Sequence, residues 1–189
     1  MEAPRGVDPE KWGRPTWVMM HGLAYLAATG ALHADVARGT LDDMRVLLPC
    51  KKCRVGLTAL IAASPVPREA RALPRWVHEA HNAVNRKKER PSPRVAMADG
   101  LGSVIAALDA RRQRALVMGA VASAARYIKR CVAERERHVQ YAAELPALRA
   151  AWSRFARVAV ALPLAWPAGA GRKKKADRRK QTRPRRLGR

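Results

Sequence analysis

Near the middle of the chain runs the stretch Trp76-Val77-His78-Glu79-Ala80-His81-Asn82-Ala83-Val84-Asn85-Arg86-Lys87. His81 and Asn85 are four positions apart, which places them on one face if the stretch is helical. A helix from residue 75 to about residue 88 is predicted, and the prolines of residues 90–93 end it. This helix would present a stripe of imidazole and amide groups that are suited to hydrogen bonding.

Three more helices are predicted before this stretch. They run from about Pro15 to Ala28, from Asp35 to Leu47 and from Cys50 to Ala63, with a proline turn at Ser64–Pro67. The chain is 48% apolar but only 5% aromatic, and long β-branched runs are scarce. Short helices with tight connections predict an all-α four-helix bundle.

A second helical region follows the bundle. Residues 95–132 are predicted to form one long helix, or two that break near residues 100–102 or at Gly119. Residues 134–160 add another helix, interrupted by Pro146. The chain is thus divided into a core at residues 1–94, an accessory helical region at 95–166 and a basic disordered tail at 167–189.

Positive charge is concentrated in the tail of a chain whose net charge is +23. Residues 172–189 hold eleven Lys or Arg against one Asp, a net +10. Such a block repels itself and attracts nucleic acid or an acidic partner without sequence specificity. Its two clusters, residues 172–175 and 178–180, also fit a nuclear-localisation signal.

Neither a secretory signal nor a membrane span is predicted. Residues 1–15 are polar, which is unlike the start of a secreted chain. The longest apolar stretches, residues 17–32 and 158–166, fall short of the roughly 20 uninterrupted residues that a spanning helix needs. We therefore expect a soluble, intracellular protein.

Two cysteines stand at the predicted start of the third helix, in Pro49-Cys50-Lys51-Lys52-Cys53. A helix N-terminus and neighbouring lysines stabilise thiolates, as redox chemistry requires. The same pair could instead join His78 and His81 in a four-ligand zinc site. This alternative predicts a zinc-stabilised, basic nucleic-acid-binding or structural protein, and the cysteine and histidine residues alone do not decide between the two.

Three segments together resemble the Erv/ALR family of FAD-linked sulfhydryl oxidases. The first is Trp12-Gly13-Arg14-Pro15-Thr16-Trp17, followed by His21-Gly22-Leu23-Ala24 and Tyr25. The second is Leu48-Pro49-Cys50-Lys51-Lys52-Cys53, and the third is the stretch at residues 76–87. They occur in the family's order, and the resemblance covers about residues 12–93.

The resemblance implies that the core binds FAD and forms disulfide bonds in protein thiols. Electrons would pass through a Cys50–Cys53 disulfide to the flavin and then to dioxygen, giving hydrogen peroxide. Cys50 would meet the substrate, and Cys53 would lie next to the flavin. The expected FAD-binding residues are Gly13, Arg14, Trp17, His21, Tyr25, His81, Asn82, Val84, Asn85, Lys87, Lys88 and Arg90.

Some features depart from the family pattern. The chain has no second CxxC, so it would oxidise protein thiols directly or through a separate dithiol shuttle protein. His78 stands where a structural cysteine is common, and Cys131 has no obvious partner. The family also implies a homodimer. Extended members without a signal peptide are common among large DNA viruses, which suggests a viral origin.

Overall fold

The computed structural model describes residues 9–87 and 100–165, and these residues form helices and no strands. The α-helices are α1 (Pro9–Ala28), α2 (Ala34–Leu47), α3 (Lys51–Ala63), α4 (Leu73–Lys87), α5 (Leu101–Ala107), α6 (Ala110–Glu136) and α7 (Leu145–Ala165). Two 3₁₀ segments, η1 (Ala70–Ala72) and η3 (Val139–Glu144), precede α4 and α7. The predicted all-α class is confirmed. Within the described ranges, no helix is long and apolar enough to cross a membrane.

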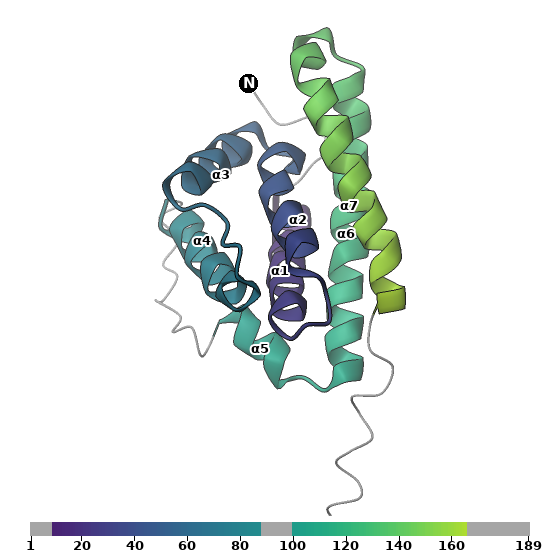
Figure 1. Cartoon of the computed structure of the whole chain (residues 1–189). Coiled ribbons are helices and arrows are strands. Elements are labelled where there is room, and N and C mark those ends of the chain that lie inside the picture. The colour runs from purple at the N-terminus through teal and green to yellow at the C-terminus, as the bar shows by residue number, and fades with distance from the viewer. Residues whose placement is uncertain (1–8, 88–99, 166–189) are drawn as a thin grey trace, which may run out of the picture.

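Helix α1 is central to the structure and contacts α2, α4, α5 and α6 (Figure 1). Its buried side chains lie on almost every side of the helix, including Met19, Met20, Leu23 and Ala24. A helix that is apolar all round is stable only when other elements cover it. The sequence of α1 therefore requires the helices that surround it.

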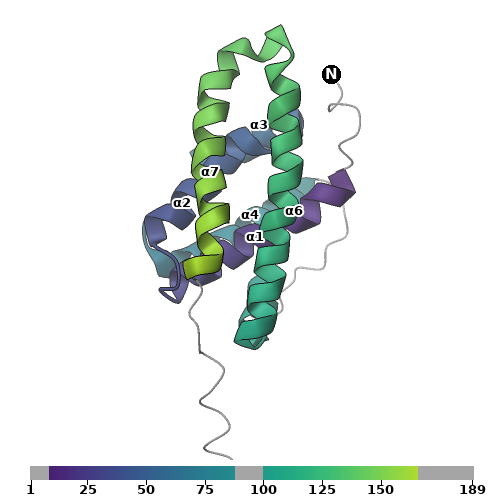
Figure 2. The same ribbon diagram turned by 90° about the vertical axis from the view of Figure 1, so that its right-hand side faces the viewer.

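Helices α6 and α7 form an antiparallel pair against the first helices. In Figure 2 the pair stands upright, with α1 and α2 crossing behind it. Helix α6 packs on α1, and α7 packs on both α6 and α2. The buried residues of α6, among them Val117, Val121 and Ile128, join those of α1 in one hydrophobic cluster.

Several helix ends follow from local signals. Helix α1 ends as predicted, where Gly30 has a left-handed φ of +77° and the Ala31 amide donates to the Leu26 carbonyl at 2.8 Å. This is the bonding of a glycine-terminated helix. Its start at Pro9, however, lies before the predicted Pro15.

The accessory helices differ from the prediction in two places. Helix α6 continues through Gly119, and the break falls before it, where the Asp109 carboxylate accepts a hydrogen bond from the Arg112 amide at 2.9 Å. Pro146 does not interrupt a helix. It lies in the first turn of α7, where a missing N–H removes no helical hydrogen bond.

Candidate active site

The cysteine pair lies at the start of α3. Cys50 is the N-cap residue, and its Sγ accepts a hydrogen bond from the Cys53 amide at 3.2 Å. Both cysteines are half-buried, while Lys51 and Lys52 between them are exposed. The predicted placement of a CxxC at a helix N-terminus is thus confirmed.

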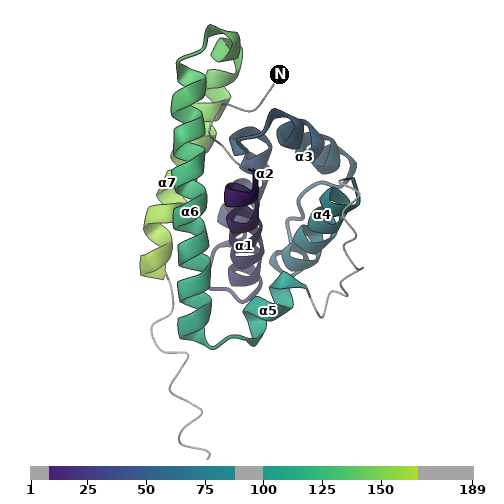
Figure 3. The same ribbon diagram turned by 180° about the vertical axis from the view of Figure 1, so that it is seen from behind.

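An apolar cavity of about 280 Å³ is lined by residues of α1, α3 and α4. Figure 3 shows how the ribbons of these three helices are arranged. Its volume is close to the lower limit of roughly 300 Å³ for small-molecule sites. Cys53 lines this cavity, and Cys50 is not among the lining residues. The lining residues are Trp12, Gly13, Thr16, Trp17, Met20, Leu48, Cys53, Gly56, Leu57, Ala59, Leu60, Ala63, Ala83 and Val84. The predicted residues Gly13, Trp17 and Val84 are therefore on the wall beside a redox-capable sulfur.

Two features of the wall fit a flat heterocycle. At Gly13 and Gly56 an added Cβ would meet nothing within 4 Å, so these glycines keep space open. Trp12 Nε1 is buried and has no hydrogen-bond partner among the described residues. An unpaired buried N–H costs about 1–3 kcal/mol, and an acceptor on a bound ring would remove that cost. Apolar walls with a few polar donors are typical of small-molecule and cofactor sites.

Rings from α1 and α4 meet next to the cavity. The Trp17 and His81 rings are stacked, with centroids 4.0 Å apart and planes 8° apart. His21 Nε2 lies 3.3 Å from His81 Nδ1, within hydrogen-bond distance. His81, from the stripe predicted on this helix, therefore meets Trp17 and His21 of α1. Since planar ligands stack on such rings, the cluster is suited to a second aromatic part of a cofactor.

His21 is neutral at physiological pH. Its side chain is buried, and burial, together with the nearby His81 and His78 rings, lowers the pKa of His21 from 6.5 to about 3. Its Nδ1 is buried and has no hydrogen-bond partner among the described residues. A neutral imidazole can still donate or accept a hydrogen bond at this atom.

The remaining predicted residues lie in different places. Tyr25 is not among the residues that line the cavity, and its hydroxyl accepts a hydrogen bond from Gln113 Nε2 of α6 at 3.3 Å. Arg14 is exposed, and Asn82 donates to His78 Nε2 at 3.0 Å. Asn85 is half-buried on α4. The side chain of Lys87, and the residues Lys88 and Arg90, lie outside the described part of the structure.

The four residues of the alternative zinc site do not form a metal centre. Cys50 and Cys53 lie at the start of α3, whereas His78 and His81 are on α4. Among residues 9–87 and 100–165, no three His, Cys, Asp or Glu side chains are grouped as metal ligands. The geometry therefore gives the zinc alternative no support.

Sequence reasoning missed two arginines that hold the segment before the cysteines. Arg54 is buried and donates to the carbonyls of Leu48 and Pro49 at 3.0 and 3.3 Å. Arg135 of α6 is also buried and donates to the carbonyls of Val46 and Leu48 at 2.8 and 2.7 Å. Charged side chains are usually exposed, so nothing in the sequence distinguished these two from the many surface arginines.

A helical fold with a CxxC at a helix start beside an apolar cavity is typical of a thiol–disulfide oxidoreductase. Comparison with known proteins defines the class further. Residues 14–98 match the Erv1 / Alr family. This region of the chain is therefore similar to that family.

One relative is the mitochondrial FAD-linked sulfhydryl oxidase ERV1 of Saccharomyces cerevisiae. It is 34% identical over 95 residues, which are 46% of this chain and 49% of the yeast protein. The chain thus matches about half the length of this curated relative. No solved structure matches the chain.

Proposed function

We propose that the chain is an FAD-dependent sulfhydryl oxidase that forms disulfide bonds in protein thiols. The observation that carries the proposal is the position of Cys53, which lines the apolar cavity while Cys50 caps the same helix start outside the lining. Such a pair can receive electrons at one sulfur and deliver them from the other. The family match and the FAD-linked yeast relative support FAD as the ligand of the cavity.

The reaction at the cysteines is a pair of thiol–disulfide exchanges. A substrate thiolate attacks Cys50 Sγ of the oxidised pair, which forms a mixed disulfide and breaks the Cys50–Cys53 bond. Cys53 leaves as a thiolate. A second substrate thiolate attacks the substrate sulfur of the mixed disulfide and releases Cys50. The substrate has then lost two electrons and gained a disulfide bond, and the cysteine pair has gained the two electrons.

The chain's own residues would hold the cofactor and shield it. Trp12 Nε1 supplies a buried donor, Gly13 and Gly56 leave room for a ring, and apolar side chains keep water from it. Trp17 and His81 provide stacking faces. Bound FAD would supply two-electron acceptance from the cysteine pair and delivery to dioxygen, giving hydrogen peroxide.

Substrates and partners follow from the same proposal. Protein thiols, or a separate dithiol protein, would reduce the Cys50–Cys53 disulfide, because the chain has no second CxxC. We propose that residues 1–94 carry the oxidase and that residues 95–166 support it, since α6 packs on α1. A homodimer, and non-specific contact of the basic tail with nucleic acid or an acidic partner, are further parts of the proposal.

Filling the cavity tests whether FAD binds there. We expect Gly56→Leu to lower FAD affinity about tenfold or more, because the new side chain occupies the space that a ring needs. FAD retained after incubation and gel filtration, and oxidation of dithiothreitol in air, measure the effect. Gly119→Leu is the matched control, since Gly119 is also helical with nothing within 4 Å of an added Cβ, but it lies on α6 away from the cavity lining.

The two variants separate the proposal from a general effect of leucine. Equal loss of FAD in both would mean that the leucine acts through the fold. Undiminished FAD binding by Gly56→Leu would place the cofactor elsewhere, and a wild-type chain that takes up no FAD would overturn the proposed function.

A further inference from the structure

The segment that carries Cys50 is fixed from outside its own helix. Helix α2 ends at Leu47, and the next residue has an extended ψ of 135°. Cys50 is also extended, with φ −85° and ψ 122°. Carbonyls at a helix end lack helical partners, so they need donors from elsewhere. Here the donors come from Arg54 and from Arg135, the latter in the accessory region.

Arg135 is a charged residue on the buried face of α6, where apolar residues are usual. The face of α6 that precedes it holds Val121, Ala124, Ile128 and Val132, all buried and apolar. Arg135 continues this face and is only 2% exposed. Burying a guanidinium costs several kcal/mol unless hydrogen bonds compensate, and an apolar residue would avoid that cost. The two carbonyls that Arg135 binds are therefore the reason for an arginine here.

The hydrogen bonds of both arginines go to the segment just before Cys50. Arg135 binds the carbonyls of Val46 and Leu48, and Arg54 binds those of Leu48 and Pro49. Leu48 thus accepts hydrogen bonds from two guanidinium groups, two residues before Cys50. Arg54 also forms an ion pair with Glu144 of η3 at 3.7 Å. Both arginines tie the segment before Cys50 to the accessory region.

We propose that Arg135 is a positioning residue of the redox centre, which holds the Leu48–Cys50 segment so that the two sulfurs stay placed for disulfide formation. The proposal rests on the proposed function only in that Cys50 and Cys53 alternate between dithiol and disulfide. The effective concentration of two thiols depends on how firmly both are held. Arg135 lies on α6, so the accessory region would help to hold the cysteine pair in place.

The test measures the equilibrium of the cysteine pair with glutathione. Oxidation forms the Cys50–Cys53 bond and releases two electrons and two protons, which convert one glutathione disulfide into two glutathione molecules. The full chain is equilibrated in buffers of varied glutathione ratio, and alkylation followed by mass spectrometry gives the fraction oxidised. The variants are Arg135→Met, Arg135→Lys and the control Arg154→Met. Far-ultraviolet circular dichroism verifies the helical fold of each.

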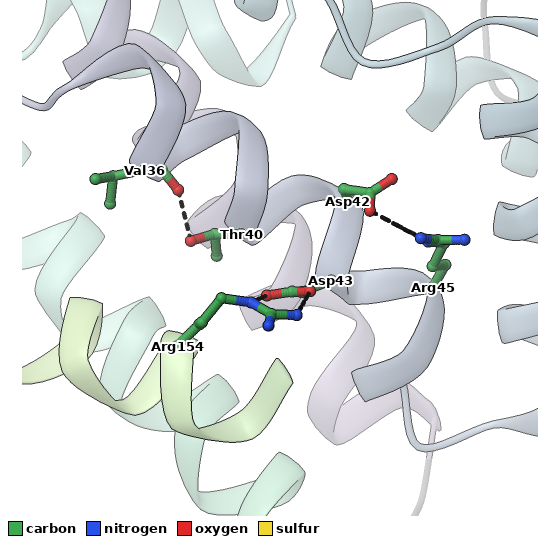
Figure 4. Close-up of polar contacts among 6 residues, drawn as sticks. All are labelled: Val36, Thr40, Asp42, Asp43, Arg45 and Arg154. Atoms are coloured by element: carbon green, nitrogen blue, oxygen red, sulfur yellow. Dashed lines mark hydrogen bonds and ion pairs between the residues drawn. The ribbon is translucent and has the colours of Figure 1, made fainter. Parts of the chain in front are cut away.

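Arg154 is a suitable control because it also joins the accessory region to the core through a guanidinium. It donates to the Asp43 carboxylate at 2.6 and 2.8 Å, and not to the segment before Cys50 that Arg135 binds (Figure 4). We expect Arg135→Met to lower the effective concentration of the pair about tenfold or more. Arg154→Met should leave this effective concentration within about threefold of the wild-type value. Arg135→Lys, which keeps the charge but not the fork of donors, should fall between the two.

Other results would overturn the proposal. These are an unchanged equilibrium in Arg135→Met, an equal drop in Arg154→Met, or a shift toward the disulfide, which would indicate that charge rather than position matters. If Arg135→Met does not fold, Arg135→Lys decides, and no change there overturns the proposal. The glutathione equilibrium does not involve FAD. A wild-type chain without FAD would therefore refute the oxidase proposal while this comparison still tests Arg135.

Discussion

At the scale of single residues, His21 is a buried histidine whose pKa is lowered well below that of a surface histidine. It lies on the central helix with an exposed fraction of 2%, and its Nε2 faces the His81 ring. The pKa of about 3 means that His21 stays uncharged in the folded chain across the physiological range. A charged imidazole at this depth would have to be desolvated beside two other histidines.

His21 should make the fold sensitive to mild acid. Its folded pKa of about 3 lies below the ordinary value of 6.5, so the unfolded chain takes up the proton first as the pH falls. Its contribution is complete above pH 6.5 and is lost as the pH falls from there toward 3. Between pH 7 and pH 5 this loss is about 2 kcal/mol in the free energy of unfolding.

Urea unfolding at the two pH values measures this loss, and His21→Gln serves as the reference. Carboxylates that titrate over the same range contribute to both proteins, so the difference between them isolates His21. Equal pH dependence in wild type and variant would show that His21 is protonated as easily in the folded chain as in the unfolded one.

Residue types predicted the helix start at the cysteine pair but not the contacts between residues that are distant in the sequence. Cys50 and Cys53 were placed correctly because a helix start follows from local sequence. Tyr25 was expected at the cofactor, but its hydroxyl meets Gln113, which lies 88 positions away in a region that the motifs do not cover. Arg135 was missed for the same reason, because its partners are 87 and 89 positions away.

At the scale of helices, the contact of α1 with α6 depends on one glycine. A Cβ at Gly22 would lie 2.6 and 2.7 Å from the two Cγ atoms of Val117, closer than atoms in contact can be. The absence of a side chain at Gly22 therefore lets the two helices approach. This close packing brings the accessory region onto the core's central helix.

Gly22→Ala should destabilise the chain by about 1–3 kcal/mol, because the added methyl forces α1 and α6 apart. Val117→Ala in the same chain should relieve the clash, with a coupling of about 1 kcal/mol or more in a double-mutant cycle.

Gly119→Ala, where an added Cβ meets nothing, should instead stabilise the chain by about 0.5–1 kcal/mol. Chemical unfolding measures all three, and independent effects of Gly22→Ala and Val117→Ala would contradict this packing.

Helix existence was easier to predict than helix ends. The first four helices were all expected, because caps and prolines mark their approximate limits. The break before α6 was expected at glycines, yet it falls at Asp109, whose carboxylate caps the next helix. Gly119 does not end α6 because the helix is held by packing on α1, and tertiary contacts outweigh a glycine's cost of about 1 kcal/mol.

At the scale of the whole molecule, the accessory helices cover the core and are bonded to it. The buried carboxylate of Asp43 on α2 receives two hydrogen bonds from Arg154 on α7 (Figure 4). Arg135 ties α6 to the end of α2 in the same way. One hydrophobic cluster includes residues of both regions. Among the described residues, the helices of 9–87 and those of 100–165 therefore share one packed interior, and the apolar cavity is lined by α1, α3 and α4.

The most direct test of the oxidase account is the visible absorption spectrum of the purified full chain incubated with FAD. The account predicts a flavin band that bleaches when dithiothreitol is added without air and returns when air is admitted. Cys53→Ser should bind FAD and keep its colour under the same reductant, because the sulfur that lines the cavity is gone. A wild-type chain that stays colourless, or a Cys53→Ser variant that bleaches as fast as wild type, would contradict the account.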